Sequence, residues 1–222
     1  MIRFQTVAAA LLAVFALVAA AAARAQTAET HQHSFGGAEH WAKVFDDPAR
    51  DEWQKPHEVI QALALAPDAV VADIGSGTGY FAVRLAHFVP QGRVYGVDIE
   101  ADMVKYLAER AKREGLDNLV SIAGRPDDPR LPAKVDLALM VDVYHHIENR
   151  VAYLRKLRKS LKVDGRIAII DFRQESPSGP PKSERVPPER VEAEMKQAGY
   201  LPASRYDFLP EQYFLVFRLG RP

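Results

Sequence analysis

The sequence predicts an α/β fold, a doubly wound sheet with helices on both faces. From residue 56 onward, short apolar runs alternate with segments whose apolar side chains recur at helical spacing. A glycine-rich loop, Gly75-Ser76-Gly77-Thr78-Gly79, follows the first such run, Val70 to Ile74, and precedes a helical pattern. Glycines allow the backbone to turn sharply and to lie against a ligand, and the helix N-terminus presents free N–H groups. This order of elements predicts a nucleotide cradle.

The other elements follow from the same two periodicities. Helices are expected over 56–65, 80–88, 102–111, 148–161 and 188–198, and strands over 93–98, 119–123, 135–141, 166–171, 201–208 and 212–219. A turn is expected at 163–165, and five prolines predict a mobile loop at 173–188. The basic face of the helix at 148–161 is expected in solvent. It consists of Arg150, Arg155, Lys156, Arg158, Lys159 and Lys162.

The spacing of the glycines indicates which nucleotide binds. The dinucleotide fingerprint G-x-G-x-x-G requires a glycine where Tyr80 stands, so the pattern is D-x-G-x-G-x-G, beginning at Asp73. With this pattern, residues 56–172 resemble the Rossmann-like (class I) methyltransferases that use S-adenosylmethionine (SAM). The resemblance implies strand order 3-2-1-4-5-7-6, an antiparallel last strand and SAM as the cofactor. Residues 124–134 leave little room for the helix that the family has there.

Asp98 is the residue assigned to the ribose of the cofactor. It ends the second strand, 19 residues beyond Gly79, and a carboxylate can accept hydrogen bonds from both ribose hydroxyls. The alternative role, capping the next helix, is assigned to Asp102. The resemblance implies further cofactor contacts from Asp73, Gly75, Ser76, Gly77, Gly79, Ile99, Met103 and Asp142. Ile99 and Met103 would pack the adenine ring, and either Asp127 or Asp128, with Asp127 preferred, would bind its amino group.

The segment Asp142-Val143-Tyr144-His145-His146 follows the fourth strand, and ligands of such sheets bind at the carboxyl ends of the strands. It is similar to the Val-Leu-His-His type of small-molecule methyltransferases, so a small-molecule acceptor is expected. His145 or His146 would orient or deprotonate the acceptor, because imidazole titrates near neutral pH, and a hydroxyl acceptor would need such a base. Alternatively both histidines are structural, and Asp142 contacts the acceptor.

The first 25 residues predict an export signal. Arg3 precedes an unbroken apolar run from Val7 to Ala23, and Ala23-Arg24-Ala25 has the small-x-small form of a cleavage site. Export to the periplasm with cleavage after Ala25 is expected, with no stable membrane span afterwards. The alternative is an uncleaved anchor, although 17 helical residues reach only about 26 Å of a core of about 30 Å.

Residues 26–55 are expected to form a lid over the active-site end of the sheet, ahead of a cofactor-binding domain over 56–222. Their aromatic residues, Phe35, Trp41, Phe45 and Trp53, recur too irregularly for one amphipathic helix. His31-x-His33 could bind a metal, but a histidine pair beside a fresh N-terminus is more often disordered, so no metal site is expected. The absence of cysteine excludes disulfides and cysteine-ligated metals.

Composition excludes some functions and leaves others open. The 222 residues suffice for one hydrophobic core. With 29 basic and 29 acidic residues, the chain has no net positive charge that would indicate binding to nucleic acid. The favoured function is methyl transfer from SAM to a small molecule. The alternatives are an exported SAM-binding protein without activity and an NAD(P)-dependent oxidoreductase, against which the missing glycine at Tyr80 argues.

Overall fold

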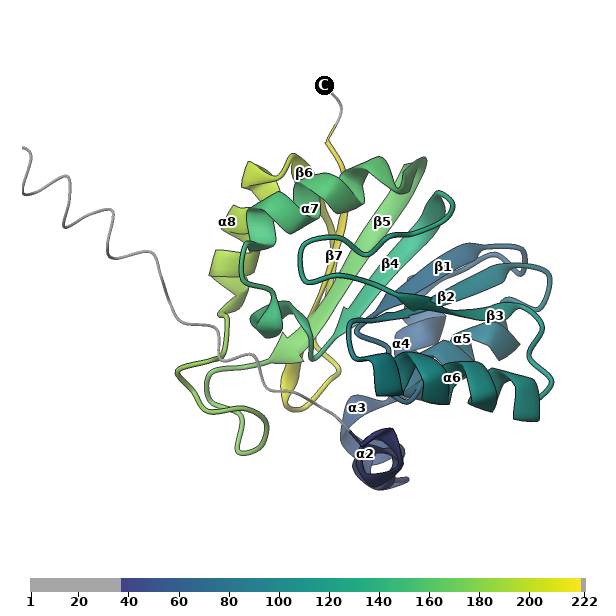
Figure 1. Ribbon diagram of the computed structural model, residues 1–222. Helices are drawn as coiled ribbons and strands as arrows, with labels where there is room; N and C mark the ends of the chain where they lie inside the picture. The colour runs from purple at the N-terminus through teal and green to yellow at the C-terminus, as the bar shows by residue number, and fades with distance from the viewer. Residues whose placement is uncertain (1–36, 221–222) are drawn as a thin grey trace, which may run out of the picture. The chain divides into compact units, whose positions relative to one another are not determined.

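A seven-stranded sheet in the order β3-β2-β1-β4-β5-β7-β6 forms the centre of the computed structural model, which describes residues 37–220 (Figure 1). The strands are β1 (Val70–Ile74), β2 (Arg93–Asp98), β3 (Leu119–Ala123), β4 (Val135–Val141), β5 (Leu161–Phe172), β6 (Tyr200–Tyr206) and β7 (Gln212–Leu219). Neighbours among β1 to β5 are parallel, and β7 is antiparallel to β5 and β6. The expected strand order and the antiparallel last strand are confirmed.

Helices cover both faces of the sheet (Figure 1). They are α2 (Ala38–Phe45), α3 (Arg50–Gln54), α4 (Pro56–Leu63), α5 (Tyr80–Phe88), α6 (Ala101–Arg113), the short 3₁₀ helix η1 (Tyr144–His146), α7 (Arg150–Lys159) and α8 (Pro188–Gln197). Alternate residues of a strand point to opposite faces, so Val71 packs with α4, α5 and α6, whereas Ala72 packs with α7 and α8. Both faces are buried, which explains why the central strands are almost uniformly apolar.

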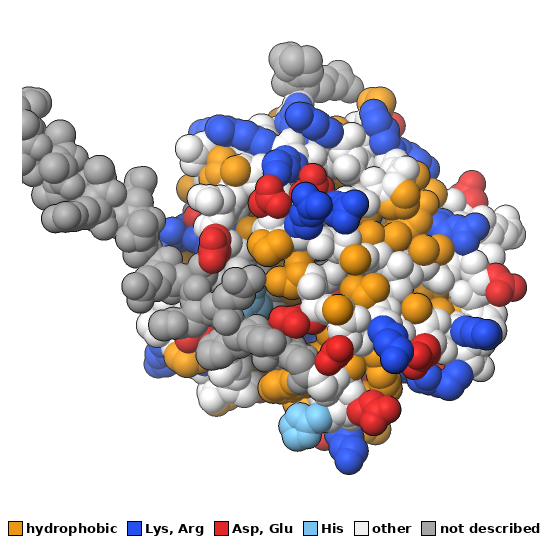
Figure 2. Space-filling model, in the orientation of Figure 1, with side chains coloured by type: hydrophobic (Ala, Val, Ile, Leu, Met, Phe, Trp, Pro, Cys, Tyr) orange, Lys and Arg blue, Asp and Glu red, His pale blue; other side chains and the backbone are white. Residues whose placement is uncertain are grey.

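The connection between β3 and β4 contains no helix, where the sequence leaves room for only a few helical residues. The one regular feature of residues 124–134 is an isolated bridge between Arg125 and Asp128. On the face seen in Figure 2, apolar side chains gather over the strands between α6 and α7. Tyr95, Ile122 and Leu131 are only partly buried against the α7 and α8 layer. The shortened connection therefore leaves part of this face without a covering helix.

Three local expectations are wrong. The expected turn at 163–165 is an irregular part of β5, where the register with β4 shifts after the pair Val135 and Leu161. Asp102 does not cap α6; it lies in the first turn, and its carboxylate accepts the N–H of Gly37. Arg150 is not a solvated residue but is 8% exposed, because Glu194 of α8 forms an ion pair with it at 2.7 Å.

The proline-rich segment at 173–187 folds around one buried arginine. The guanidinium of Arg185, which is 8% exposed, donates to the carbonyl oxygens of Arg173, Gln174, Ser176, Ser178 and Pro180. A planar group with five N–H donors suits such a ring of carbonyls. These contacts organise the segment around Arg185, and the mobility that its composition predicts stays a prediction.

The expected signal peptide over 1–25, its cleavage site and the pair His31-x-His33 lie outside the described residues. Within residues 37–220, no helix has both the length and the apolar character needed to span a membrane.

Candidate functional site

The glycine loop, Asp98 and Asp142 meet at one edge of the sheet. The glycine loop follows β1, Asp98 ends β2, and Asp142 follows β4 directly. These strands are parallel, so their carboxyl ends lie at the same edge. Gln212, the first residue of β7, joins them because it pairs with Phe172 at the end of β5.

The glycine loop adopts a backbone that requires glycine. Gly75, Gly77 and Gly79 have φ of 72°, 52° and 100°, in the left-handed region that residues with a Cβ rarely occupy. The hydroxyls of Ser76 and Thr78, buried in the same loop, have no hydrogen-bond partner among the described residues. A buried hydroxyl without a partner is costly, which favours a ligand that supplies one.

Asp98 bridges the loop and the next helix. Its Oδ2 accepts the N–H of Gly77 at 2.8 Å, and its Oδ1 accepts the N–H of Glu100 at 3.0 Å. Burial raises the pKa of Asp98, and these backbone hydrogen bonds oppose the rise. Each carboxylate oxygen has a second lone-pair site, so both retain capacity for a hydroxyl.

Asp73 lies at the end of β1 and is 3% exposed. Burial raises its pKa to about 7, although the positive charge of Arg50 acts in the opposite direction. A cationic ligand beside Asp73 would favour its ionised form.

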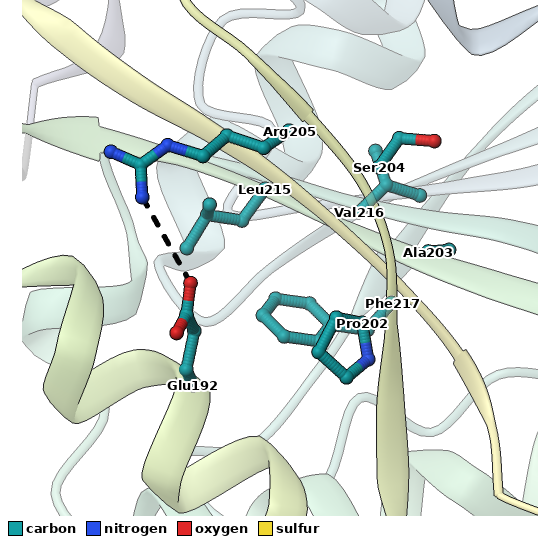
Figure 3. A pocket seen from close by; sticks show the side chains of 8 residues that line it. All are labelled: Glu192, Pro202, Ala203, Ser204, Arg205, Leu215, Val216 and Phe217. Atoms are coloured by element: carbon teal, nitrogen blue, oxygen red, sulfur yellow. Dashed lines mark ion pairs between the residues drawn. The ribbon is translucent and has the colours of Figure 1, made fainter.

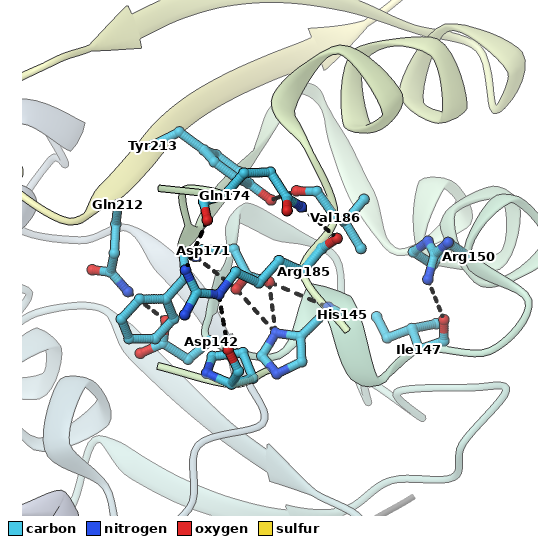
Figure 4. A network of polar contacts seen from close by, with 12 residues as sticks. Asp142, His145, Ile147, Arg150, Asp171, Gln174, Arg185, Val186, Gln212 and Tyr213 are labelled. Atoms are coloured by element: carbon cyan, nitrogen blue, oxygen red, sulfur yellow. Dashed lines mark hydrogen bonds and ion pairs between the residues drawn. The ribbon is translucent and has the colours of Figure 1, made fainter. Parts of the chain in front are cut away.

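Asp142 is held by side chains from two distant segments, α3 and the start of β7, as Figure 4 shows in part. Its carboxylate accepts hydrogen bonds from the side-chain amides of Gln54, at 3.1 Å, and Gln212. The guanidinium of Arg50 lies 3.6 Å away. Burial raises the pKa of Asp142 to about 6 despite the charge of Arg50. Its φ of 58° is unusual for a residue with a side chain and is a strain typical of functional sites.

The two histidines are adjacent but not equivalent. His145 is 6% exposed, and its Nδ1 lies 2.9 Å from Oδ2 of Asp171, near the end of β5 (Figure 4). The ring of His146 lies 4.0 Å from that of His145, centroid to centroid, and is partly exposed. The structure thus brings His145 to the sheet edge with a carboxylate partner.

The residues expected at adenine are more dispersed. Ile99 is 47% exposed beside Asp98, while Met103 is buried in α6. The carboxylate of Asp127 is exposed and forms an ion pair with Lys156. Oδ1 of Asp128 accepts the N–H of Arg130 at 2.8 Å. Both acids are engaged with the protein itself, and the choice between them stays a prediction.

The described part of the expected lid packs against the cofactor loop. The ring of Phe45, in α2, lies beside Gly77, where a Cβ would come within 3.4 Å of it. Asp46 forms an ion pair with Arg110 of α6 at 2.9 Å, and Arg110 also donates to the carbonyl of Thr78. Helix α3 supplies Arg50 and Gln54 to Asp142.

These residues suit a SAM-like cofactor. The loop offers two unsatisfied hydroxyls, Asp98 offers capacity for a ribose diol, and Asp73 offers a buried carboxylate for a cationic group. Ile99 adds exposed apolar area next to Asp98. Among the residues that the structure describes, no group of three or more histidine and acidic side chains could hold a metal ion.

Sequence reasoning missed four residues of this site, namely Arg50, Gln54, Asp171 and Gln212. Arg50 and Gln54 belong to a segment interpreted only through its aromatics, and Gln212 reaches the site because β7 inserts beside β5. Asp171 could have been predicted from the sequence, because it is an acidic residue near the carboxyl end of β5, the strand next to β4.

A separate hollow of about 210 Å³ lies between α8 and the strands β6 and β7 (Figure 3). An ion pair of 4.0 Å between Glu192 and Arg205 crosses it. None of the predicted site residues lines this hollow.

A family model described as "Methyltransferase domain" matches residues 65–204. A SAM-dependent methyltransferase from Aquifex aeolicus has a similar structure, with a TM-score of 0.76 and 25% identity over 82% of this chain and 98% of that one. Magnesium protoporphyrin IX methyltransferase from Synechocystis, solved with bound S-adenosylhomocysteine, shares the fold at a TM-score of 0.63 and 17% identity, over 82% of this chain and 93% of that one.

Among curated relatives, the malonyl-[acyl-carrier protein] O-methyltransferase of Priestia megaterium is 25% identical over 135 residues. The match covers 59% of this chain and 48% of that relative. The chain spans about half of the length of such relatives. In a polyketide synthase of Burkholderia thailandensis, the matched region is 5% of that protein's length.

Proposed function

Because the chain belongs to the class I SAM-dependent methyltransferase family, we propose that it transfers a methyl group from SAM to a small-molecule acceptor. The observation that carries the proposal is the glycine loop with its two unsatisfied hydroxyls, placed against the carboxylate of Asp98. SAM, when bound, supplies a methyl group on a sulfonium, which is already activated for displacement. The protein's task is then to position the donor and the acceptor.

The acceptor that we propose is a small molecule rather than a nucleic acid. Equal numbers of basic and acidic residues, 29 each, give the chain no net positive charge that would attract nucleic acid. The buried polar cluster around Asp142 and His145 suits recognition of a compact polar group instead.

We also propose that the protein is exported to the periplasm, with cleavage after Ala25. The support is the apolar run from Val7 to Ala23 and the small-x-small site that follows it.

Calorimetric titration with SAM, S-adenosylhomocysteine and NAD tests the proposed cofactor. The wild type should bind the first two and not NAD. Asp98→Ala should weaken binding by about 1.5–3 kcal/mol, or about 10- to 150-fold, because a charge-assisted hydrogen bond to the ribose is lost. Asp164→Ala removes an exposed acid near the start of β5 and should leave both affinities unchanged. Equal affinity of Asp98→Ala and wild type would remove Asp98 from the site.

If NAD binds and SAM does not, the oxidoreductase alternative replaces the proposal. If SAM binds but no extract of membrane or periplasm yields a labelled product from radiolabelled SAM, the alternative of a binding protein without activity is favoured.

A further inference from the structure

Arg50 of α3 is a largely buried cation whose guanidinium has more donors than partners. Its side chain is 14% exposed. Nε donates to the side-chain oxygen of Gln54, and Nη1 donates to the carbonyl of Phe45 at 2.9 Å. Nη2 lies 3.6 Å from Oδ2 of Asp142, which is beyond hydrogen-bond distance. A guanidinium has five N–H groups, so three are without an acceptor among the described residues, and such donors favour an anionic ligand.

The surroundings of Arg50 fix where its guanidinium lies. It stacks on the ring of Tyr80, 4.2 Å from the centroid, and lies 6.0 Å from the ring centroid of Trp53. The hydroxyl of Tyr80, the first residue of α5, donates to the carboxylate of Asp51, which follows Arg50 in α3. A guanidinium that is held by its flat face keeps its N–H groups available around its edge.

The charge of Arg50 acts on two buried carboxylates. It opposes the rise that burial causes in the pKa of Asp73 and of Asp142. Two acids and one guanidinium therefore lie together at the carboxyl ends of β1 and β4. At neutral pH the methionyl end of SAM carries an ammonium group, a sulfonium and a carboxylate. Each of these charges has an opposite charge in this part of the site, and Arg50 is the one that suits the carboxylate.

The order of the strands places the methionyl end of SAM on the side of Arg50. Along the sequence of neighbours β2-β1-β4, Asp98 ends β2, the glycine loop follows β1 and Asp142 follows β4. With the ribose on Asp98 and the adenine at Ile99, as proposed, the other end of the cofactor extends across the glycine loop toward β4. Arg50 lies there, beside Asp142.

We propose that Arg50 binds the carboxylate at the methionyl end of SAM, so that α3 forms part of the cofactor site. This inference rests on the proposed methyl transfer and adds the residue that recognises the amino-acid part of the cofactor. Arginine and a carboxylate can form two parallel hydrogen bonds, for which Arg50 retains enough donors. Because α3 also binds α5 through Asp51, and Asp142 through Gln54, bound cofactor holds α3 against the sheet edge.

Calorimetric titration with SAM and with decarboxylated SAM tests this role, because the two ligands differ only in the carboxylate. The wild type should bind SAM about 10- to 150-fold more tightly. Arg50→Gln should weaken SAM binding by a similar factor, but it should not weaken binding of decarboxylated SAM, which carries only positive charges. Arg84→Gln is the matched control, because Arg84 stacks on the same ring of Tyr80 but pairs with Asp51. It should keep the wild-type preference for SAM.

Two results of these titrations would overturn the role of Arg50. One is an equal loss of affinity for both ligands in Arg50→Gln, which would mean that Arg50 acts only through the fold. The other is equal affinity of the wild type for SAM and decarboxylated SAM, a comparison that needs no variant to fold. Arg50→Lys keeps the charge but not the paired donors, so its preference for SAM should lie between those of the wild type and Arg50→Gln.

Hydrogen–deuterium exchange tests whether the carboxylate couples the cofactor to α3. S-adenosylhomocysteine should slow amide exchange in α3 of the wild type, but not in Arg50→Gln. The probe 5′-methylthioadenosine keeps the adenosine and the sulfur but lacks the amino-acid part, so it should slow exchange at the glycine loop and not in α3. Equal protection of α3 by both compounds would contradict the coupling.

The two proposals fail differently. If the wild type binds neither SAM nor decarboxylated SAM, the proposed function itself is wrong. If it binds both with equal affinity, the proposed methyl transfer stands and the assignment of Arg50 is wrong.

Discussion

The ionisation of Asp73, a proposed cofactor contact, links the stability of the protein to pH. The carboxyl of Asp73 is 3% exposed, and burial raises its pKa to about 7 in the folded protein. In the unfolded chain the pKa is about 4. Between about pH 4 and pH 7 the folded state therefore holds a proton that the unfolded state has released. Its contribution to stability is therefore present at low pH and lost as the pH rises through about 7. Above about pH 7 the ionised form is therefore maintained at the expense of stability, which agrees with the proposed contact of Asp73 with the cofactor.

Asp73→Asn should therefore be more stable than the wild type at pH 8, by about 2–4 kcal/mol, and this advantage should shrink toward pH 5. Urea denaturation at both pH values measures it, with the exposed Asp164→Asn as control. The same variant should bind SAM more weakly, because the buried negative charge is absent. Equal stability of Asp73→Asn and wild type at pH 8 would contradict the assignment.

Single residues were the least predictable part of the site. The glycines and Asp98 were recognisable because their spacing is local and their chemistry follows from it. Arg150 was not, since its burial depends on Glu194, 44 residues further along the chain. Gln54 and Gln212 were also missed, because they meet each other and Asp142 only after three distant segments assemble.

At the scale of elements, residues 37–55 are separable from the core. Both apolar clusters are built from residues at or beyond Val59. Within α2 and α3, only Ala38 and Gln54 are buried. The contacts of this segment with the sheet edge are mainly polar, through Arg50, Gln54 and Asp46.

Deletion of residues 26–50 should accordingly leave a folded sheet that exchanges bound S-adenosylhomocysteine faster than the wild type. Loss of Phe45 beside Gly77 and of the ion pair between Asp46 and Arg110 uncovers the cofactor loop. Circular dichroism reports folding, and stopped-flow release of the ligand reports exchange. Arg110→Gln, which keeps the chain whole but removes the pair, should give a smaller acceleration. If the truncated chain does not fold, the segment belongs to the core.

Strands and helices with clear periodicity were predicted nearly to the residue. β2, β3, β4 and β7 have the expected bounds. Failures occurred where tertiary contacts replace local signals. Residues 163–165, where a turn is expected, instead belong to β5. The hydrogen bonds of Arg185 within the proline-rich loop could not be foreseen from composition, and the mobility of that loop stays a prediction.

At the scale of the whole molecule, the alternation of strands and helices predicted the architecture, but the strand order came from the family resemblance. Periodicity alone does not place β7 between β5 and β6, since no local pattern distinguishes an inserted strand from an edge strand. The part of the sheet face between α6 and α7 has no covering helix, because the connection between β3 and β4 contains none. That a helix is missing there can be recognised only by comparison with the family.

Export concerns the whole chain and is tested on the intact protein. The protein recovered from a cell envelope fraction should begin at Gln26, because cleavage is expected after Ala25. Intact mass spectrometry measures this directly. Ala23→Arg with Ala25→Arg should block cleavage and yield the longer mass. A full-length product in the cytosol of wild-type cells would contradict export.

The position of β7 has a consequence for biosynthesis. This strand is the last of the sheet to be synthesised, yet it lies inside the sheet and carries the consecutive buried residues Tyr213 to Phe217. Until these residues leave the ribosome, β5 has an open edge and β6 has no partner strand. In a nascent chain of this topology the sheet cannot close before β7 has left the ribosome, so chaperones can engage the open edge of β5 until then.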